Sequence, residues 1–320
     1  MSTPLEGPAR PPVCVLGLGL IGGSLLRALV AAGRTAWGYN RSPETVRDAE
    51  AAGFDATADL AAALRRAAEQ DALIVIAVPT PIVGQVAAAI AAHAPGCALT
   101  DVVSVKQPVR DAVAEHGLLP RFVGGHPMAG TAESGWAAGY AELFTGAVWV
   151  VTVDEGADPQ VWTQVATMAV DAGAQVVPAE SAEHDAAVAR ISHLPHLLAE
   201  ALASVGAGSQ LALALAAGSF RDGTRVAATA PELVRAMCEG NSTALLGALD
   251  EALELLTNAR ASLAAQNDLT ELTDNGHAAR RNYEQARRSE IRNLEPGIPG
   301  WREQLRDAGR AGGVWCEVTA

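Results

Sequence analysis

The sequence predicts an α/β domain with a parallel sheet, followed by an all-α helical domain. From about residue 12 to residue 180, short apolar runs typical of β-strands alternate with helical patterns, and such runs stop after that point. Strands that alternate with helices at this spacing form βαβ units around a parallel sheet. The 320 residues are enough for two domains with full cores.

The strands of the first domain are expected to be short and buried. The run Leu73–Val78 is apolar throughout, which is typical of a buried parallel strand rather than a half-exposed one. The predicted strands are Val13–Leu16, Thr35–Tyr39, Leu73–Val78, Ala98–Val103, Phe122–Gly124, Val148–Val153 and Gln175–Val177. The predicted helices between them are Ser24–Ala32, Pro43–Ala52, Ile82–Ala92, Gln107–His116 and Gln160–Ala172.

After residue 180 the composition changes from Val- and Gly-rich strands to helices rich in Ala, Leu, Glu and Arg. The predicted helices are Ala182–Ala203, Ser209–Gly218, Pro231–Thr257 and Leu263–Arg292. We therefore expect a first domain over residues 11–180, a helical domain over 181–293, and an irregular C-terminal tail over 294–320. The tail is rich in Pro, Gly and Arg, and the sequence indicates no role for it.

Charge, cysteine content and hydropathy exclude several classes of protein. The chain has 23 basic and 36 acidic side chains, a net charge of −13, which disfavours binding to nucleic acid. The 4 cysteines are scattered and form no metal-binding or disulfide pattern, as expected in a reducing cytoplasm. The uncharged stretches 72–100 and 201–220 are interrupted by Pro, Gly or polar residues, so we expect no membrane span. The sequence thus predicts a cytoplasmic protein.

A glycine-rich turn follows the first predicted strand and opens the first helix. Its sequence is Gly17-Leu18-Gly19-Leu20-Ile21-Gly22. In the G-x-G-x-x-G motif the first Gly makes the tight turn, the second lets the backbone approach a pyrophosphate, and the third allows close helix–strand packing. The helix N-terminus then offers free N–H groups to the phosphates. This motif in this context predicts a Rossmann-type NAD(P)-binding domain.

The end of the second predicted strand bears on the choice between NAD and NADP. It carries Asn40, Arg41 and Ser42, whereas an NAD-preferring site usually has Asp or Glu there to bind the ribose hydroxyls. The missing carboxylate and the nearby arginine favour NADP, with NAD as the alternative. The remaining predicted cofactor contacts are Gly17, Gly19, Leu20, Ile21, Gly22, Val78 and Pro79.

Polar residues follow two further strands of the predicted sheet. Ser104 lies in Asp-Val-Val-Ser-Val-Lys after one strand, and His126 lies in Gly-His-Pro-Met-Ala-Gly after the next. Ligands of open α/β sheets bind outside the carboxyl ends of the strands, so both side chains are expected to face the nicotinamide crevice. The helical domain adds Ser-His-Leu-Pro-His, which begins at Ser192, and Phe-Arg-Asp-Gly-Thr-Arg, which ends at Arg225.

Taken together and in this order, these motifs resemble the prephenate/arogenate dehydrogenases of tyrosine biosynthesis. The resemblance runs from about Val13 to Asn241 and covers both predicted domains. It implies an oxidoreductase that oxidises a cyclohexadienol at its ring C4 hydroxyl, with hydride transfer to NAD(P)⁺ and loss of the ring carboxylate as CO₂. The leading expectation is prephenate dehydrogenase, which yields 4-hydroxyphenylpyruvate.

The resemblance also assigns roles to individual residues. His126 matches the catalytic histidine that takes the hydroxyl proton, and Ser104 matches the serine that hydrogen-bonds this histidine. Arg225 matches the arginine that binds the ring carboxylate, and His193 matches a histidine of the substrate pocket. Asp222 matches an acid that orders the arginine and the pocket entrance. The residue types fit the chemistry, because histidine is the natural base near neutral pH and arginine binds a carboxylate bidentately.

Several alternatives stay open. Arogenate dehydrogenase, which yields tyrosine directly, is a close rival, because Val234 and Ala132 depart from residues that some family members carry at the substrate pocket. A β-hydroxyacid dehydrogenase is disfavoured, since those enzymes use a catalytic lysine of the second domain and no Lys follows Lys106. A non-catalytic dinucleotide sensor is the alternative from another class. His193 and His196 could share a helical face, but without a third ligand they predict no metal site.

The helical domain is long and carries many apolar residues for the surface that it has. Members of the family commonly pair through this domain. We therefore expect a homodimer built through the helical domain, with a small-molecule substrate as the other partner.

Overall fold

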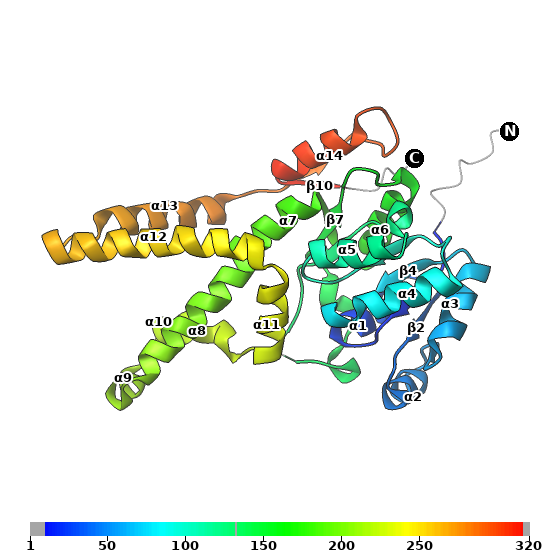
Figure 1. The fold of residues 1–320 in the computed structure, drawn as a ribbon, viewed down its shortest axis with the longest axis horizontal. Coiled ribbons are helices and arrows are strands. Elements are labelled where there is room, and N and C mark those ends of the chain that lie inside the picture. Colours follow the sequence, from blue (N-terminus) through cyan, green and yellow to red (C-terminus); the bar gives the residue numbers. More distant parts are fainter. Residues whose placement is uncertain (1–9, 132, 316–320) are drawn as a thin grey trace. The chain divides into compact units, whose positions relative to one another are not determined.

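A computed structural model describes residues 10–131 and 133–315. The chain forms two compact units, whose elements are labelled in Figure 1. Unit 1 contains the residues up to His184 together with those from Ser289 onward, and unit 2 contains Asp185–Arg288. Ala132, one of the pocket departures noted above, lies outside the described residues.

The first sheet of unit 1 has the predicted Rossmann-type architecture. Its strand order is β3-β2-β1-β4-β5, and every neighbouring pair is parallel. Its central strands β1 and β4 are fully buried and pair in register, with Val15 beside Val75. The strands are β1 (Val13–Leu16), β2 (Ala36–Tyr39), β3 (Ala56–Thr57), β4 (Leu73–Ile76) and β5 (Leu99–Asp101).

Helices cover the sheet and bury an apolar stripe against it. The helices are α1 (Leu20–Ala31), α2 (Pro43–Ala51), α3 (Leu60–Glu69), α4 (Val83–His93) and α5 (Gln107–Glu115). Sequence reasoning missed α3, although it has clear helix signals. Asp59 caps its N-terminus by accepting from Ala62 N at 2.9 Å, and its buried residues Ala63, Leu64 and Ala67 recur with helical spacing.

The expectation of one parallel sheet for all the strands is wrong. A second sheet has the order β6-β7-β8-β10-β9 and is mixed, with β6 antiparallel to β7. Parallel neighbours are usually joined through a crossover helix, whereas the described residues between β6 and β7, 128–131 and 133–147, contain only short 3₁₀ turns. The helix α6 (Pro159–Asp171) supplies such a crossover for the parallel pair β7 and β8. The strands are β6 (Gly125–Pro127), β7 (Val148–Thr152), β8 (Gln175–Ala179), β9 (Ser289–Ile291) and β10 (Gly313–Trp315).

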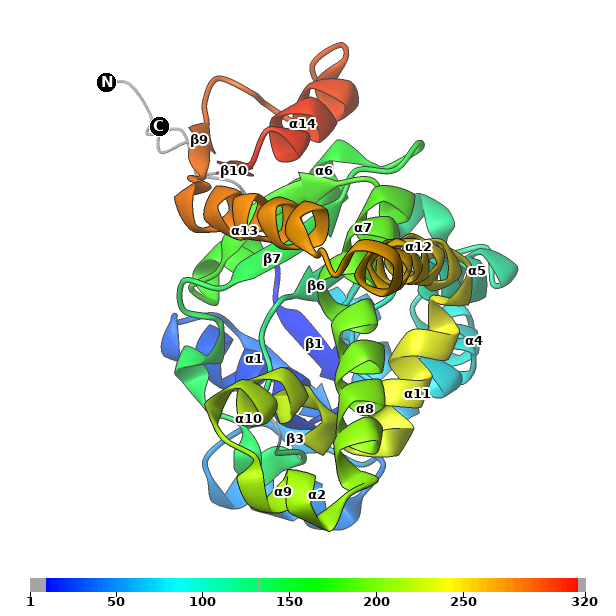
Figure 2. The ribbon, with the colours of Figure 1, turned by 90° about the vertical axis from the view of Figure 1, so that its left-hand side faces the viewer.

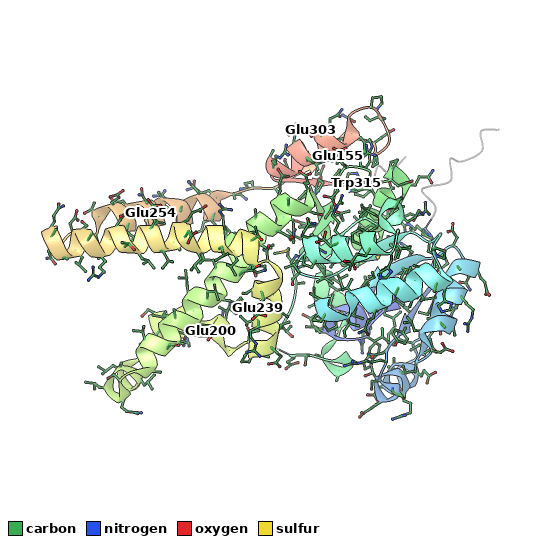
Figure 3. All side chains as sticks on the ribbon, in the orientation of Figure 1. Glu155, Glu200, Glu239, Glu254, Glu303 and Trp315 are labelled. Atoms are coloured by element: carbon green, nitrogen blue, oxygen red, sulfur yellow. The ribbon has the colours of Figure 1, made fainter. Side chains whose placement is uncertain are left out.

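The expectation of an irregular C-terminal tail is also wrong. Residues 289–315 form β9, the helix α14 (Trp301–Arg310) and β10, and both strands join the second sheet. Trp315, labelled in Figure 3, packs edge-to-face on Trp162 of α6 with 5.3 Å between ring centroids. Arg306 donates from Nε to the carbonyl of Val153 at 2.7 Å. The residues Pro296, Gly297, Pro299 and Gly300, which suggested irregular chain, lie in the turn between β9 and α14.

Unit 2 is helical, as predicted, but its helices are shorter than the sequence patterns suggested. The predicted helix Pro231–Thr257 is interrupted at Asn241, and Asn267 ends the long helix α12 in a left-handed conformation with φ 52°. Helices α12 and α13 form a hairpin (Figure 1). The helices are α8 (Leu194–Ala207), α9 (Gln210–Leu215), α10 (Gly218–Thr224), α11 (Pro231–Gly240), α12 (Ser242–Gln266) and α13 (Thr270–Gln285). None of the helices in the described part of the chain has the length and apolarity needed to cross a bilayer.

Candidate active site

The glycine turn between β1 and α1 has the geometry that dinucleotide binding requires. Gly17 has φ 114°, and a Cβ there would lie 2.4 Å from the Ala77 carbonyl oxygen. A Cβ on Gly22 would lie 1.9 Å from the Gly17 carbonyl oxygen, so α1 could not pack there with a larger residue. Gly19 differs, because a Cβ would meet no protein atom within 4 Å. The space over Gly19 is thus open to a ligand, as in a site where backbone approaches a pyrophosphate.

The N-terminus of α1 adds the electrostatic part of this site. Gly19 is the N-cap residue, and no side chain caps the first turn of the helix. The free N–H groups and the positive end of the helix dipole favour an anion at this position. The residues present therefore fit a dinucleotide phosphate.

A cavity of about 350 Å³ lies beside this turn. Six of the predicted cofactor residues line it, namely Gly17, Gly19, Asn40, Arg41, Val78 and Pro79. The predicted contacts Leu20 and Ile21 instead pack against the hydrophobic core. Sequence reasoning missed other lining residues, which are Leu18, Tyr39, Leu60, Ala77, Ile82, Gln85 and Val86.

The residues after β2 set the chemistry of one wall of this cavity. Asn40 Oδ1 accepts a hydrogen bond from Ser42 N at 3.2 Å, and Ser42 Oγ accepts from Thr45 N at 3.3 Å as the N-cap of α2. The serine hydroxyl is therefore used within the protein. The exposed Arg41 is the cationic side chain in the cavity lining.

The two motifs after β5 and at β6 are joined by a buried ion pair. Asp101 is 0% exposed and Lys106 is 1% exposed, and Lys106 Nζ donates to Asp101 Oδ2 and to the Gly125 carbonyl oxygen. Asp101 also accepts from Val103 N at 2.9 Å and from Gly125 N at 3.1 Å. Burial raises the pKa of the Asp101 carboxyl, and the Lys106 ammonium and these N–H donors oppose that rise. This network holds β6 against the end of β5.

The predicted catalytic base lies in the middle of β6. His126 pairs with Val150 of β7 and is half-buried. Its Nδ1 lies 2.8 Å from Nε2 of His184 on the helix α7 (Ser181–Val188), and the two rings meet edge-to-face at 79°. Ser104, the predicted partner of His126, is half-buried after β5. The structure thus gives Nδ1 of His126 a histidine partner that sequence reasoning missed, and the Ser104 contact stays a prediction.

The predicted substrate residues belong to unit 2. His193 is 1% exposed, and its Nδ1 lies 3.2 Å from Asn241 Nδ2. Asp222 pairs with its neighbour Arg221 at 3.2 Å, rather than with Arg225 as the predicted role would suggest. Arg225 is exposed at the start of a 3₁₀ turn. In residues 10–131 and 133–315, no group of three or more His, Cys, Asp or Glu side chains is arranged to hold a metal ion.

Comparison with known proteins assigns both parts of the chain to one family. The family model described as prephenate dehydrogenase, nucleotide-binding domain, matches residues 25–178. The model described as prephenate dehydrogenase, dimerization domain, matches residues 180–275. The chain belongs to the prephenate dehydrogenase family. The predicted family resemblance, the nucleotide-binding domain, the helical second domain and the oxidoreductase class are thereby confirmed.

Individual members of the family resemble most of the chain. The cyclohexadienyl dehydrogenase of Zymomonas mobilis is 34% identical over 270 residues, which are 80% of this chain and 89% of that one. A solved structure of a candidate prephenate dehydrogenase from Corynebacterium glutamicum is 51% identical with a TM-score of 0.90, and covers 96% of this chain and 98% of its own. The structure of Synechocystis arogenate dehydrogenase is 31% identical with a TM-score of 0.75, and covers 85% of this chain and 99% of its own.

Proposed function

We propose that the protein catalyses the NADP⁺-dependent oxidative decarboxylation of prephenate to 4-hydroxyphenylpyruvate, a step of tyrosine biosynthesis. The observation that carries this proposal is the position of His126 on β6 in a chain that belongs to the prephenate dehydrogenase family. His126 has its Nδ1 bound to a buried neighbour, and this orientation suits Nε2 for accepting a proton.

The reaction balances without any further reactant. The C4 hydroxyl gives its proton to Nε2 of His126, and the hydrogen on C4 leaves as hydride. C4 thereby becomes a carbonyl carbon. The bond between C1 and its carboxylate breaks, CO₂ departs, and the electron pair of that bond completes the aromatic ring with the negative charge on the C4 oxygen. The His126 imidazolium then returns its proton to that oxygen, which gives the phenol of the product. Bound NADP⁺ supplies the hydride acceptor, and Gly17, Gly19 and Arg41 are the residues that would hold it.

Three residues of unit 2 are also proposed to act on the substrate. Arg225 is proposed to bind the ring carboxylate, since its guanidinium matches a carboxylate bidentately. His193 and Asp222 are proposed to shape the pocket, and Ser104 to orient His126 when substrate is bound. The net charge of −13 makes a local cation necessary for a dianionic substrate.

Arogenate is the second candidate substrate, because the Synechocystis arogenate dehydrogenase is 31% identical to this chain. The two substrates differ only in a keto or amino group on the side chain. Val234, which departs from the family pattern, is 7% exposed in the core of unit 2. Its apolar side chain cannot distinguish a keto from an amino group by hydrogen bonding.

A direct assay tests the proposed function. Purified protein is given prephenate or arogenate with NAD⁺ or NADP⁺, and the absorbance of the reduced cofactor is followed. We expect the highest kcat/KM for prephenate with NADP⁺. Preference for arogenate would support the second candidate, and cofactor binding without turnover of either substrate would refute the dehydrogenase assignment.

The cofactor preference gives a prediction of its own. Replacing Arg41 by alanine removes the cation from the cavity wall and should lower the ratio of kcat/KM for NADP⁺ to that for NAD⁺ about tenfold. The matched control is Arg47→Ala, which changes an exposed arginine of α2 outside the cavity lining. An unchanged ratio in Arg41→Ala would contradict the NADP assignment.

We further propose that the protein is a homodimer through unit 2. Of the 18 exposed large hydrophobic side chains among the described residues, 15 lie in unit 2, whose own core cluster has only 5 buried members. So much exposed apolar surface is typical of an interface between subunits. Light scattering should give twice the monomer mass, and Val205→Asp together with Leu215→Asp should shift the protein towards monomer. A wild-type monomer would disprove the proposal.

We place the protein in the cytoplasm. Cys14, Cys97 and Cys238 are free and buried, as expected for a chain that folds in a reducing compartment. Burial raises the pKa of the Cys14 thiol to about 12, so this thiol stays protonated and unreactive at neutral pH.

A further inference from the structure

His184 is a buried histidine that the proposed mechanism does not yet use. It is 3% exposed, and its Nε2 lies 2.8 Å from Nδ1 of His126. The ring centroids are 5.0 Å apart and the planes are nearly perpendicular, at 79°. This geometry directs Nε2 of His184 towards Nδ1 at the edge of the His126 ring.

The scaffold around His184 is well anchored within unit 1. The start of α7 is held by Ser181, which donates from N and Oγ to Asp154 at 2.9 and 2.7 Å. His184 N donates to the Glu180 carbonyl oxygen at 2.9 Å. Glu183 accepts from Arg310 of α14 at 2.7 Å. These bonds anchor the backbone that carries His184, so its ring starts from a fixed position beside His126.

The contact requires one nitrogen to donate and the other to accept. If Nδ1 of His126 carries the hydrogen, Nε2 of His126 has a lone pair and can act as the base. If Nε2 of His184 carries the hydrogen, neutral His126 is protonated on Nε2 and cannot take a proton there. The function of the site therefore depends on which tautomer of His126 the pair selects.

We propose that His184 is a positioning residue that accepts a hydrogen bond from Nδ1–H of His126 and so selects the tautomer with a basic Nε2. This inference rests on the proposed function, in which His126 takes the hydroxyl proton. When His126 becomes an imidazolium, its Nδ1–H donates more strongly to the same acceptor, which stabilises the charge that forms during the reaction.

The use of a neutral acceptor fits the charge of the proposed substrate. Hydrolases with a comparable arrangement orient the catalytic histidine with a carboxylate. A carboxylate here would add a negative charge beside a dianionic substrate, and the repulsion between like charges at short range would weaken substrate binding. Histidine accepts the same hydrogen bond without that repulsion.

Two substitutions of His184 distinguish the effect of its hydrogen bond to His126 from the effect of any polar side chain at this position. Glutamine places an amide oxygen near the position of the histidine Nε2, whereas asparagine, one methylene shorter, does not reach it. We expect His184→Asn to lower kcat at least about tenfold with KM for prephenate and cofactor affinity within about threefold of wild type. We expect His184→Gln to restore kcat to within about threefold.

Nitrogen NMR of ¹⁵N-histidine-labelled full-length protein tests the tautomer without any turnover. We expect His126 in the wild type to be protonated on Nδ1 and to lose this preference in His184→Asn. Protonation of neutral His126 on Nε2 in the wild type would overturn the inference, as would equal loss of kcat in both variants or no loss in His184→Asn. Because the NMR result needs no substrate, failure of the proposed reaction and failure of this inference are distinguishable.

Discussion

Replacing His126 by asparagine is expected to lower kcat about 10³-fold, which corresponds to about 4 kcal/mol of transition-state stabilisation. Asparagine is similar in size but has no basic nitrogen, so the C4 hydroxyl would lose its proton acceptor. KM should stay within a few-fold of wild type, because the ring carboxylate is proposed to bind Arg225. Steady-state rates with prephenate and NADP⁺ measure both parameters.

The control for this substitution is His93→Asn, which changes an exposed histidine at the end of α4. It removes an imidazole of the same kind from the same unit and should leave kcat unaltered. A His126→Asn variant that keeps more than a tenth of wild-type kcat would show that another group takes the proton.

The second large effect is expected from Lys106→Met. Methionine fills a similar volume but leaves the fully buried Asp101 carboxylate without its cation. Removing one partner of a buried ion pair costs about 3–5 kcal/mol of folding free energy. The loss should appear as a lower free energy of unfolding of unit 1 in a urea titration. All 6 tryptophans lie in unit 1, so tryptophan fluorescence reports on this unit alone.

Arg292→Met is the matched control, because it removes an arginine whose pair with Glu290, at 2.7 Å, has side chains 77% and 58% exposed. Exposed pairs contribute about 0–1 kcal/mol, so this variant should unfold at nearly the wild-type urea concentration. Equal destabilisation by the two substitutions would mean that the buried pair has no special part in holding β5 and β6 together.

The parts of the molecule that could be predicted from sequence are those with local physical causes. The glycine turn is one, since the need for Gly22 arises from the carbonyl oxygen of Gly17, five residues earlier in the same βα unit. The residues after β2 are another, because Asn40 and Arg41 follow a strand whose neighbour β1 was also predicted. Helical composition was enough to predict unit 2 as a helical domain.

The parts that could not be predicted depend on contacts between distant segments. The pairing of His126 with His184 joins β6 to α7, and no spacing rule relates these two positions. Lys106 was given no role; Asp101 is only five residues away, but the second partner, the Gly125 carbonyl oxygen, comes close only where β6 lies against the end of β5. The antiparallel β6 followed from a connection without a crossover helix, which the alternating strand pattern did not indicate.

The pairing of β10 with β8 has a consequence for the newly made chain. Residues Asp185–Arg288 are translated between these two strands, so β8 has an unpaired edge until Gly313–Trp315 leave the ribosome. At about 5–20 residues per second, that interval is on the order of ten seconds. An open strand edge can pair with other chains, which makes this the period of greatest risk of aggregation. The nucleotide-binding unit is therefore completed only after the helical unit has been synthesised.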